Sequence, residues 1–480
     1  MELKFRCEAR DLDAVLAVAP GTGLETRALT STYFDTPDGA LSRRHMSLRL
    51  REDFGGVPVQ TFKCGQGLSR QELEWSAPGG LNLKHAELRV LLKAPLRKAL
   101  VPVFKVTIHR RQRTFDYKGA RIELALDQGE VCMGDQRRPI CEVELELKAG
   151  SRADLFDLAQ VLSKAAPLRL SFLGKASQGQ MLVQPAPSFS QDTSLALTRD
   201  TLLVDAFQTL AHRAIVDLAL HAEAYSEFGE PRALHALRVS TRRLQSYLAT
   251  FDRLLDETGA KRVRQHLNWL LKVSAEARNI DVFAQTYLHA QSPADLATVV
   301  MAAGAAAHAR TRGVLASARF RGLLLDIVAW LETHAWRGRT DRANRALGGK
   351  IKRFARKSLS RRLESLTRRT GNLRTLDPEA RHEVRLKIKR LRYALEAFAS
   401  MFASGDSAPY LRSLRAIQSY LGDLNDVATA EHLVDSLNLG DLEVPARRLV
   451  RDTASSLEQR VAASNRQLKR LLGQTPPWAT

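Results

Sequence analysis

The chain has 480 residues, of which 44% are hydrophobic and 26% are charged, and its formal net charge is +21. This length predicts two or three domains with sizeable cores, and the positive charge favours a polyanionic partner or an anionic surface. The segment MELKFR is charged from its second residue, and no apolar run approaches the roughly 18 residues of a membrane span. We therefore expect neither a secretory signal nor a membrane-spanning helix.

The excess positive charge is concentrated in the C-terminal part. Residues 1–190 contain 28 Lys and Arg against 22 Asp and Glu, a net charge of +6, whereas residues 191–480 contain 45 against 30, a net charge of +15. All four cysteines lie in the first third and lack the spacing of a metal site. We expect them to be reduced thiols in a cytoplasmic protein; they are Cys7, Cys64, Cys132 and Cys141.

From residue 1 to about residue 180 the dominant sequence period is two. Segments such as residues 48–51, 70–75 and 142–148 alternate charged and apolar residues, which is typical of strands with one charged and one apolar face. Residues 151–162 have a helical period, so we predict an α+β domain. An ordinary antiparallel sheet with one face in water would alternate similarly. However, the charged faces cluster ionic groups of both signs, and a barrel closed around them would hold an anion together with a divalent metal.

The charged faces supply both kinds of ligand that a metal-bound phosphate chain needs. Lys and Arg bind phosphate oxygens, and Mg²⁺ or Mn²⁺ takes carboxylate, substrate and water oxygens. The candidate catalytic cations are Lys4, Arg49, Arg51, Lys63, Arg110 and Lys175. The candidate metal ligands are Glu2, Glu123, Asp127, Glu142 and Glu144, with Glu72, Glu74 and Glu146 as further acidic candidates.

The strand predicted over residues 142–146 makes the metal hypothesis specific. The period of two places Glu142, Glu144 and Glu146 on one face, where adjacent carboxylates repel one another unless a cation is present. A divalent metal would relieve this repulsion. The alternative is that Lys4, Arg49 and similar groups neutralise the strand as ion pairs.

These segments resemble the CYTH family of triphosphate tunnel metalloenzymes. The resemblance runs from Glu2-Leu3-Lys4 through residues 33–37, 48–51, 61–63, 72–74, 122–127 and 140–147 to Gly174-Lys175-Ala176. It implies an eight-stranded antiparallel β tunnel barrel that binds triphosphate, with metal on the carboxylates. The family pattern begins E-x-E-x-K, and its first glutamate has no counterpart before Met1-Glu2-Leu3-Lys4. Either translation starts further upstream or the second metal site is weakened.

Residues 181–198 contain two prolines, several Ser and Thr and little charge, and we place a linker there between domains at residues 1–180 and 199–480. Beyond it the period is helical, which predicts an all-α domain. We expect helices opening at Pro231 and Pro378, and others over residues 200–225, 261–278, 293–315, 320–336, 351–370, 409–422, 425–436 and 445–472.

An internal duplication organises the predicted helical domain into repeats at about residues 199–340 and 341–480. Residues 233–251 return 147 positions later as residues 380–398, with seven of nineteen positions identical. In each copy a histidine is followed by basic residues at offsets of 3, 7 and 8, which share one helical face. These candidates are His235, Arg238, Arg242 and Arg243, and then His382, Arg385, Lys389 and Arg390. Packed side by side, the two basic faces would suit an extended polyanion. The alternative is two solvated surfaces.

This repeated helix resembles the CHAD family, an α-helical domain named for its histidines. The resemblance implies two four-helix bundles related by a pseudo-twofold axis that bind inorganic polyphosphate. A CYTH domain followed by CHAD is similar to bacterial inorganic triphosphatases, which implies metal-dependent hydrolysis of triphosphate to pyrophosphate and phosphate. The alternatives are a catalytically weak polyphosphate-binding protein associated with granules, a thiamine triphosphatase or a class IV type adenylate cyclase. We expect no specific nucleic-acid binding, because aromatic residues are only 6% and no recognition motif is present.

Overall fold

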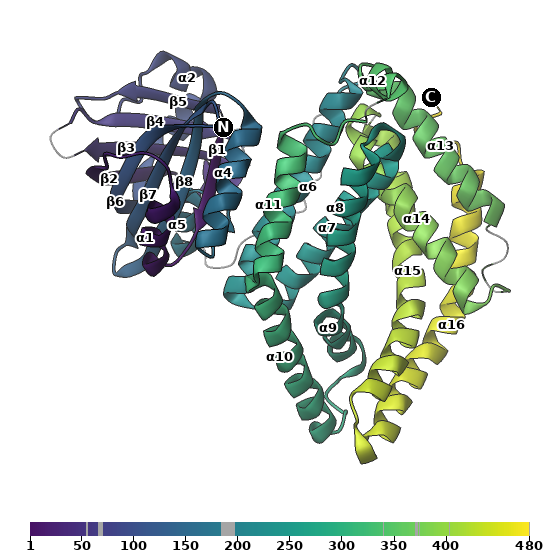
Figure 1. Ribbon diagram of the computed structural model, residues 1–480. Helices are drawn as coiled ribbons and strands as arrows, with labels where there is room; N and C mark the ends of the chain where they lie inside the picture. Colours follow the sequence, from purple (N-terminus) through teal and green to yellow (C-terminus); the bar gives the residue numbers. More distant parts are fainter. Residues whose placement is uncertain are drawn as a thin grey trace. The chain divides into compact units, whose positions relative to one another are not determined.

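The computed structural model describes residues 1–53, 56–65, 71–183, 197–338, 340–369, 373, 375–402 and 404–479. The chain divides into two compact units, which Figure 1 draws as ribbons. The first comprises Met1–Phe189 and Ala316–Thr333, and the second comprises Ser190–Leu315 and His334–Thr480. Most of the linker predicted over residues 181–198 lies outside the described residues.

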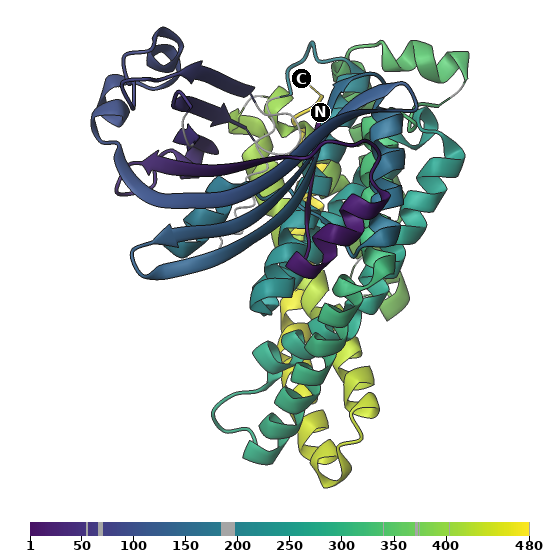
Figure 2. The same ribbon diagram turned by 60° about the vertical axis from the view of Figure 1, so that its left-hand side comes forward.

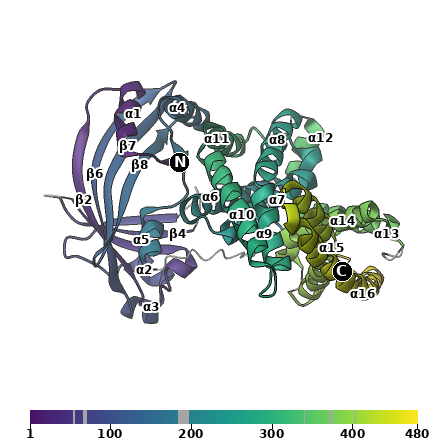
Figure 3. The same cartoon turned by 90° about the horizontal axis from the view of Figure 1, so that it is seen from below.

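One antiparallel sheet of nine strands forms the framework of the first unit. Its strand order is β5-β4-β3-β2-β6-β7-β8-β1-β9. Figures 2 and 3 show that the long central strands β6, β7 and β8 are strongly curved. The strands are β1 (Glu2–Arg6), β2 (Glu25–Asp35), β3 (Met46–Asp53), β4 (Val59–Cys64), β5 (Gln71–Ser76), β6 (Val101–Tyr117), β7 (Ala120–Met133), β8 (Gln136–Ala149) and β9 (Arg169–Leu170).

The predicted fold class, an antiparallel N-terminal sheet followed by a helical region, is confirmed, with two differences in the sheet. A ninth strand is present because the two residues of β9 pair with Phe5 and Arg6 on the free edge of β1. Among the described residues no hydrogen-bonded ladder joins β5 to β9, so the sheet is not closed. A two-residue strand leaves too few backbone groups in line to complete a barrel seam.

The helices of the first unit cover the sheet at several places. They are α1 (Leu12–Val18), α2 (Ala86–Leu91), α3 (Ala94–Lys98), α4 (Arg152–Ala165), α5 (Lys175–Val183) and α11 (Ala318–Glu332). Helix α5 contacts β6, β7 and β8, and its Ala176 and Leu182 pack on a cluster that includes Tyr33, Phe104 and Ile108. Through these contacts the apolar residues of α5 hold Lys175, at its first turn, against the sheet.

Helix α11 belongs to the first unit although its sequence lies within the predicted helical domain. It packs against α4 and β9, and the Arg152 guanidinium at the start of α4 pairs with Glu332 at 3.3 Å. Nine of its fifteen residues are buried, including Leu323 and Trp330. A helical period shows that a face is buried but does not show which body buries it.

The second unit is helical throughout its regular structure. Its helices are α6 (Leu203–Phe228), α7 (Pro231–Phe251), α8 (Glu257–Val273), α9 (Ala275–Tyr287), α10 (Ala294–Ala316), α12 (Asp341–Leu347), α13 (Ile351–Arg369), α14 (Pro378–Phe398), α15 (Ser404–Ser436) and α16 (Glu443–Gly473). Helix α7 packs with α6, α8 and α9, α14 packs with α13 and α15, and α7 and α14 meet each other. The two copies of the duplicated sequence are therefore neighbouring helices.

Two predicted helix boundaries are wrong. The helix expected over residues 261–278 is interrupted at Ser274, whose backbone leaves the helical conformation and separates α8 from α9. The two helices expected over residues 409–422 and 425–436 are one continuous helix, α15, because Asp423 and Leu424 do not interrupt the hydrogen-bonding pattern.

Gly129 provides a test of the sheet packing. A Cβ atom at this position of β7 would lie 2.0 Å from the carbonyl oxygen of Thr107 on β6, so Gly129→Ala must push the strands apart. We expect a loss of about 1–3 kcal/mol in the free energy of unfolding, measured by chemical denaturation. The matched control is Gly79→Ala, where a Cβ meets nothing within 4 Å. Equal stabilities of the two variants would contradict the close packing of β6 on β7.

Candidate functional site

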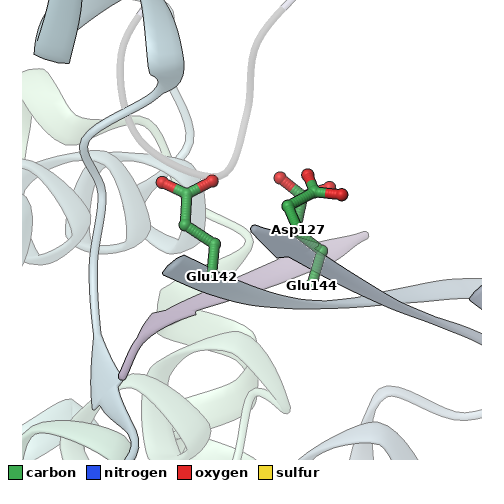
Figure 4. A group of neighbouring side chains, drawn as sticks. All are labelled: Asp127, Glu142 and Glu144. Carbon is green, nitrogen blue, oxygen red and sulfur yellow. The ribbon is translucent and has the colours of Figure 1, made fainter. Parts of the chain in front are cut away.

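Three carboxylates, two of them fully buried, gather on one face of the sheet. Asp127 lies on β7, and Glu142 and Glu144 lie on β8, with Asp127 directly opposite Glu142 in the strand register. One oxygen from each of the three lies within 4.8 Å of the others, and Figure 4 shows the three side chains extending to the same side of the strands. Asp127 has no exposed surface at all. Such a group is stable in its ionised form only if cations accompany it.

Three cations surround this acidic cluster, and each comes from a different element. Arg110 on β6, opposite Asp127, donates two hydrogen bonds to that carboxylate at 2.7 and 2.6 Å and a third to Glu144 at 2.6 Å. Lys175 on α5 lies 2.7–2.9 Å from oxygens of all three carboxylates. Lys4 on β1, opposite Glu144, approaches its Oε1 to 2.9 Å.

Where the pKa of a carboxylate of this cluster or of a surrounding cation is shifted, the shift favours the charged form. Burial alone would raise the pKa of Glu144, but Lys175, Lys4 and Arg110 hold that pKa well below its usual range. Burial alone would lower the pKa of Lys175, but Glu142, Glu144 and Asp127 raise it well above its usual range. The network is therefore three anions against three cations, close to neutral overall.

A second group of cations lines the strands β3 and β4. Arg49 interacts with the Tyr33 hydroxyl. Burial lowers the pKa of Arg49, but Tyr33, Glu72 and Glu74 together raise it by more, so the pKa lies above its usual value. Its Nε atom is buried without a hydrogen-bond partner. For the neighbouring Arg51, burial and the charge of Arg49 lower the pKa. Arg51 lies 3.6 Å from Glu74, farther than the 2.6 Å contacts that Arg110 makes with Asp127 and Glu144, so Arg49 and Arg51 are better placed than Arg110 to bind an added anion.

Both groups face a cavity of about 880 Å³. Twelve of the fourteen candidates from the sequence line it: Glu2, Lys4, Arg49, Arg51, Lys63, Glu72, Glu74, Arg110, Glu123, Glu144, Glu146 and Lys175. Asp127 and Glu142 lie behind this lining, fully buried. Glu2 and Glu123 stand apart from the acidic cluster: Glu2 is 4.0 Å from Lys4, and Glu123 pairs with Lys148 at 3.4 Å.

The structure adds residues that the sequence pattern did not indicate. The Gln178 side chain donates a hydrogen bond to Glu142 at 2.6 Å, and Arg27 and Lys148 also line the cavity. Gln178 follows Lys175 by three residues on α5, so helical spacing could have suggested it. Arg27 lies two residues after Glu25 on β2, so a period of two places both charged side chains on the same face of the strand.

The donor set of the acidic cluster fits a hard divalent cation. Oxygen ligands from two or three carboxylates are what Mg²⁺ or Mn²⁺ requires. All six carboxylate oxygens accept hydrogen bonds or ion pairs from Lys4, Arg110, Lys175 or Gln178. A bound metal would therefore take the place of an ammonium group on Glu144, and Lys4 is the more exposed of the two lysines there.

In the second unit, the duplicated helices α7 and α14 bring four of the candidate basic residues together with Arg278 of α9. We call Arg238, Arg242, Arg278, Arg385 and Lys389 the basic cluster. Burial first, and then the charges of Arg242, Arg385, Arg392 and Arg238, lower the pKa of Lys389 to about 6. The four arginine charges add to the effect of burial, so Lys389 lies in positively charged surroundings.

Arg238 and the two histidines of these helices also interact with nearby groups. Arg238 donates hydrogen bonds to the Leu271 carbonyl and to Ser274. Burial of the His235 ring, followed by the charges of Arg278 and neighbouring cations, lowers the pKa of His235 to about 4. His382 hydrogen-bonds to Asn425 at 2.7 Å.

The basic residues at the offset of 8 do not join the basic cluster. Arg243 is buried and lies 3.7 Å from Asp217 of α6. Arg390 is exposed, and its charge acts on Arg362 of α13. An offset of 8 turns the side chain further round the helix than offsets of 3 and 7, and here that rotation directs it to a different neighbour.

Family models match residues in each of the two units. The family model of the CYTH domain matches residues 1–179, and that of the CHAD domain matches residues 209–435. A Haemophilus influenzae protein named inorganic triphosphatase is 28% identical over 193 residues, which are 36% of this chain and 55% of that protein. The chain thus spans about half the length of this relative.

Two solved structures are also similar. The CHAD domain from the plant Ricinus communis superposes with a TM-score of 0.50 at 27% identity and covers 61% of this chain and 98% of its own. A Hippeastrum protein described as a putative adenylyl cyclase with a dominant triphosphatase activity covers 37% of this chain and 94% of its own, at 16% identity and a TM-score of 0.29.

The first unit is thus an antiparallel sheet with a cavity lined by acidic and basic side chains, and the second unit is helical with a cluster of basic residues. The family models identify a CYTH domain over residues 1–179 and a CHAD domain over residues 209–435. In the described part of the chain, no helix has the length and hydropathy needed to cross a membrane.

Glu144→Gln tests the charge balance of the acidic cluster. Because the folded-state pKa of Glu144 is depressed, its contribution to stability is present above the unfolded-state pKa of about 4.3 and is lost as the pH falls below that value. We expect a loss of about 3 kcal/mol in the free energy of unfolding at pH 7, and a smaller loss at pH 3.

Chemical denaturation at the two pH values measures this difference. The control is Glu146→Gln, which removes a half-exposed carboxylate paired with Lys148 and should cost less than about 1 kcal/mol. A loss for Glu144→Gln that is the same at pH 3 and pH 7 would show that the charge of Glu144 is not what stabilises the fold.

Proposed function

We propose that the first unit hydrolyses inorganic triphosphate to pyrophosphate and phosphate with the help of Mg²⁺ or Mn²⁺. The observation that carries this proposal is a cavity of about 880 Å³ with a carboxylate cluster beside it. On β3, the buried Nε atom of Arg49 has no hydrogen-bond partner. The match to the CYTH family model and similarity to a protein named inorganic triphosphatase support the proposal.

In this proposal the cations of the cavity bind the phosphate chain. Arg49, Arg51 and Lys63 would contact phosphate oxygens from β3 and β4, and Arg110 and Lys4 would contact them from β6 and β1. Fixed guanidinium groups stabilise negative charge that develops on the leaving pyrophosphate without having to reorganise. The low content of aromatic residues around the cavity, where Tyr33 and Phe172 are the aromatic lining residues, favours a phosphate chain over a nucleotide base.

The metal would be held chiefly by Glu144, with Asp127 and Glu142 behind it and Glu2 and Glu123 as outer candidates. When bound, it would supply charge neutralisation of phosphate oxygens and an activated water molecule. Lys175 and Gln178 fix the orientation of Glu142 and Glu144 through hydrogen bonds. When the metal replaces Lys4 on Glu144, the Lys4 ammonium group can contact phosphate.

We expect phosphate release from tripolyphosphate to be Mg²⁺-dependent and faster than from ATP. Arg51→Ala should lower kcat/KM for tripolyphosphate by roughly 10²-fold, because it removes a donor to the reacting phosphates. The control, Arg10→Ala, removes an exposed arginine paired with Glu8 outside the cavity. Equal or faster turnover of ATP would favour a nucleotide-specific enzyme, and binding of tripolyphosphate without any turnover would favour a binding protein.

For the second unit we propose binding of inorganic polyphosphate at the basic cluster. The support is the convergence of Arg238, Arg242, Arg385 and Lys389 from the two duplicated helices, together with the CHAD family match. An anion there would gain favourable contacts and would relieve repulsion among the cations. Polyphosphate granules in the cytoplasm are then the proposed location, in keeping with four free cysteines.

Polyphosphate affinity should depend on pH through Lys389. Its pKa is about 6 in the free protein, so at pH 8 the amine is neutral and binding of a polyanion must be accompanied by proton uptake. We expect affinity to rise as the pH falls from 8 to 6, by at most about tenfold per pH unit, and to fall with added salt.

Isothermal titration in buffers of different ionisation enthalpy measures the proton uptake. Lys389→Met should flatten the pH dependence, whereas Lys469→Met, which removes an exposed lysine of α16, should leave it unchanged. A pH dependence that persists unaltered in Lys389→Met would exclude Lys389 as the titrating group.

A further inference from the structure

A pair of thiols lies at one end of the β1–β8 ladder, apart from the residues assigned to phosphate binding. Cys7 follows β1, and Cys141 lies on β8. The Cys7 amide donates to the Cys141 carbonyl oxygen at 3.3 Å, and the two Sγ atoms are 3.7 Å apart. Because Arg6 stands opposite Glu142 in the register, the next step along the ladder places the two cysteines directly opposite each other.

This position suits a disulfide. The bond from the Cys7 amide to the Cys141 carbonyl marks a hydrogen-bonded position of the ladder. Cα atoms at such positions are about 5.5 Å apart, and disulfides span Cα separations of about 4.4–6.8 Å. The sulfur atoms need to approach to about 2.05 Å, which is within the range of side-chain rotation. In the described part of the chain no other pair of sulfur atoms is in contact: Cys132 hydrogen-bonds to Glu130, and Cys64 has no sulfur partner.

We propose that Cys7 and Cys141 form a reversible redox site that reacts with low-molecular-weight disulfides such as glutathione disulfide. Cys7 is only 9% exposed, whereas Cys141 is partly exposed, so the oxidant meets Cys141 first. Both cysteines are free thiols in the structure.

The reaction is a double thiol–disulfide exchange. The Cys141 thiolate attacks one sulfur of glutathione disulfide, breaks its S–S bond and releases one glutathione thiolate, which takes up the proton that Cys141 lost. The Cys7 thiol then loses its proton, attacks the Cys141 sulfur and releases the second glutathione as a thiol. Two cysteine thiols are oxidised to one disulfide, and one glutathione disulfide is reduced to two glutathione molecules.

The bond would fasten the strand that carries Lys4. Strand β1 has five residues. On its outer side, the described residues that pair with it are the two residues of β9 and Ser171, whose amide donates to the Lys4 carbonyl at 2.9 Å. A link between positions 134 residues apart restricts the unfolded chain strongly, which raises the unfolding temperature. Oxidation would therefore secure β1 against β8 beside the acidic cluster.

Peptide mapping of the full chain after native incubation with glutathione disulfide tests the proposal. Free thiols are alkylated before digestion and mass spectrometry. We expect a linked Cys7–Cys141 peptide, two glutathione molecules released per chain, alkylated Cys64 and Cys132, and full reversal by dithiothreitol. The oxidised protein should also unfold at a higher temperature than the reduced protein.

Two variants separate the steps. Cys7→Ser should retain glutathione on Cys141 and lose the temperature shift, whereas the matched control Cys132→Ser should form the Cys7–Cys141 link as the parent does. The proposal is overturned if neither cysteine reacts in the parent, if glutathione stays on Cys141 while Cys7 remains free, or if links involving Cys64 or Cys132 are as abundant. The parent mapping requires no substitution, so a variant that fails to fold does not block the test.

Discussion

The gathering of three ionised carboxylates, two of them fully buried, on one face of the sheet is the constraint on which the first unit depends. Asp127 and Glu142 have almost no exposed surface, and an unpaired charge at such depth costs several kcal/mol. The compensating cations Arg110, Lys4 and Lys175 come from β6, β1 and α5. The charge balance therefore depends on both the strand register and the docking of α5. The loss of any one cation leaves three carboxylates against two cations.

The second unit differs in its charge balance. In the acidic cluster three carboxylates meet three cations, whereas the basic cluster gathers four arginines around Lys389. Burial first, and then the charges of Arg242, Arg385, Arg392 and Arg238, lower the pKa of Lys389 to about 6. Asp426 lies near Arg278 and Arg385, and its charge offsets only part of the excess. A site that is neutral by itself suits a metal and a short anion together, and a site with excess positive charge suits a long polyanion.

Much of this arrangement follows from sequence periodicity. The period of two identified eleven of the residues that line the cavity, because alternation along a strand decides which side chains share a face. It could not show that Glu123 pairs with Lys148 away from the acidic cluster, or that Gln178 reaches Glu142, since these contacts depend on tertiary packing. Likewise, the helical repeat placed Arg238 and Arg385 correctly on adjoining helices, but it could not assign α11 to the first unit or direct Arg243 to Asp217.

We propose that the acidic cluster and the cations of β3 and β4 together hold a metal-bound triphosphate. A crystal structure of the full chain with tripolyphosphate and Mn²⁺, with the metal located by anomalous scattering, can test this arrangement. We expect a manganese peak within about 2.6 Å of a Glu144 carboxylate oxygen and phosphate groups in contact with Arg49 and Arg51. A metal peak away from Glu144, or a triphosphate bound outside the cavity, would contradict it.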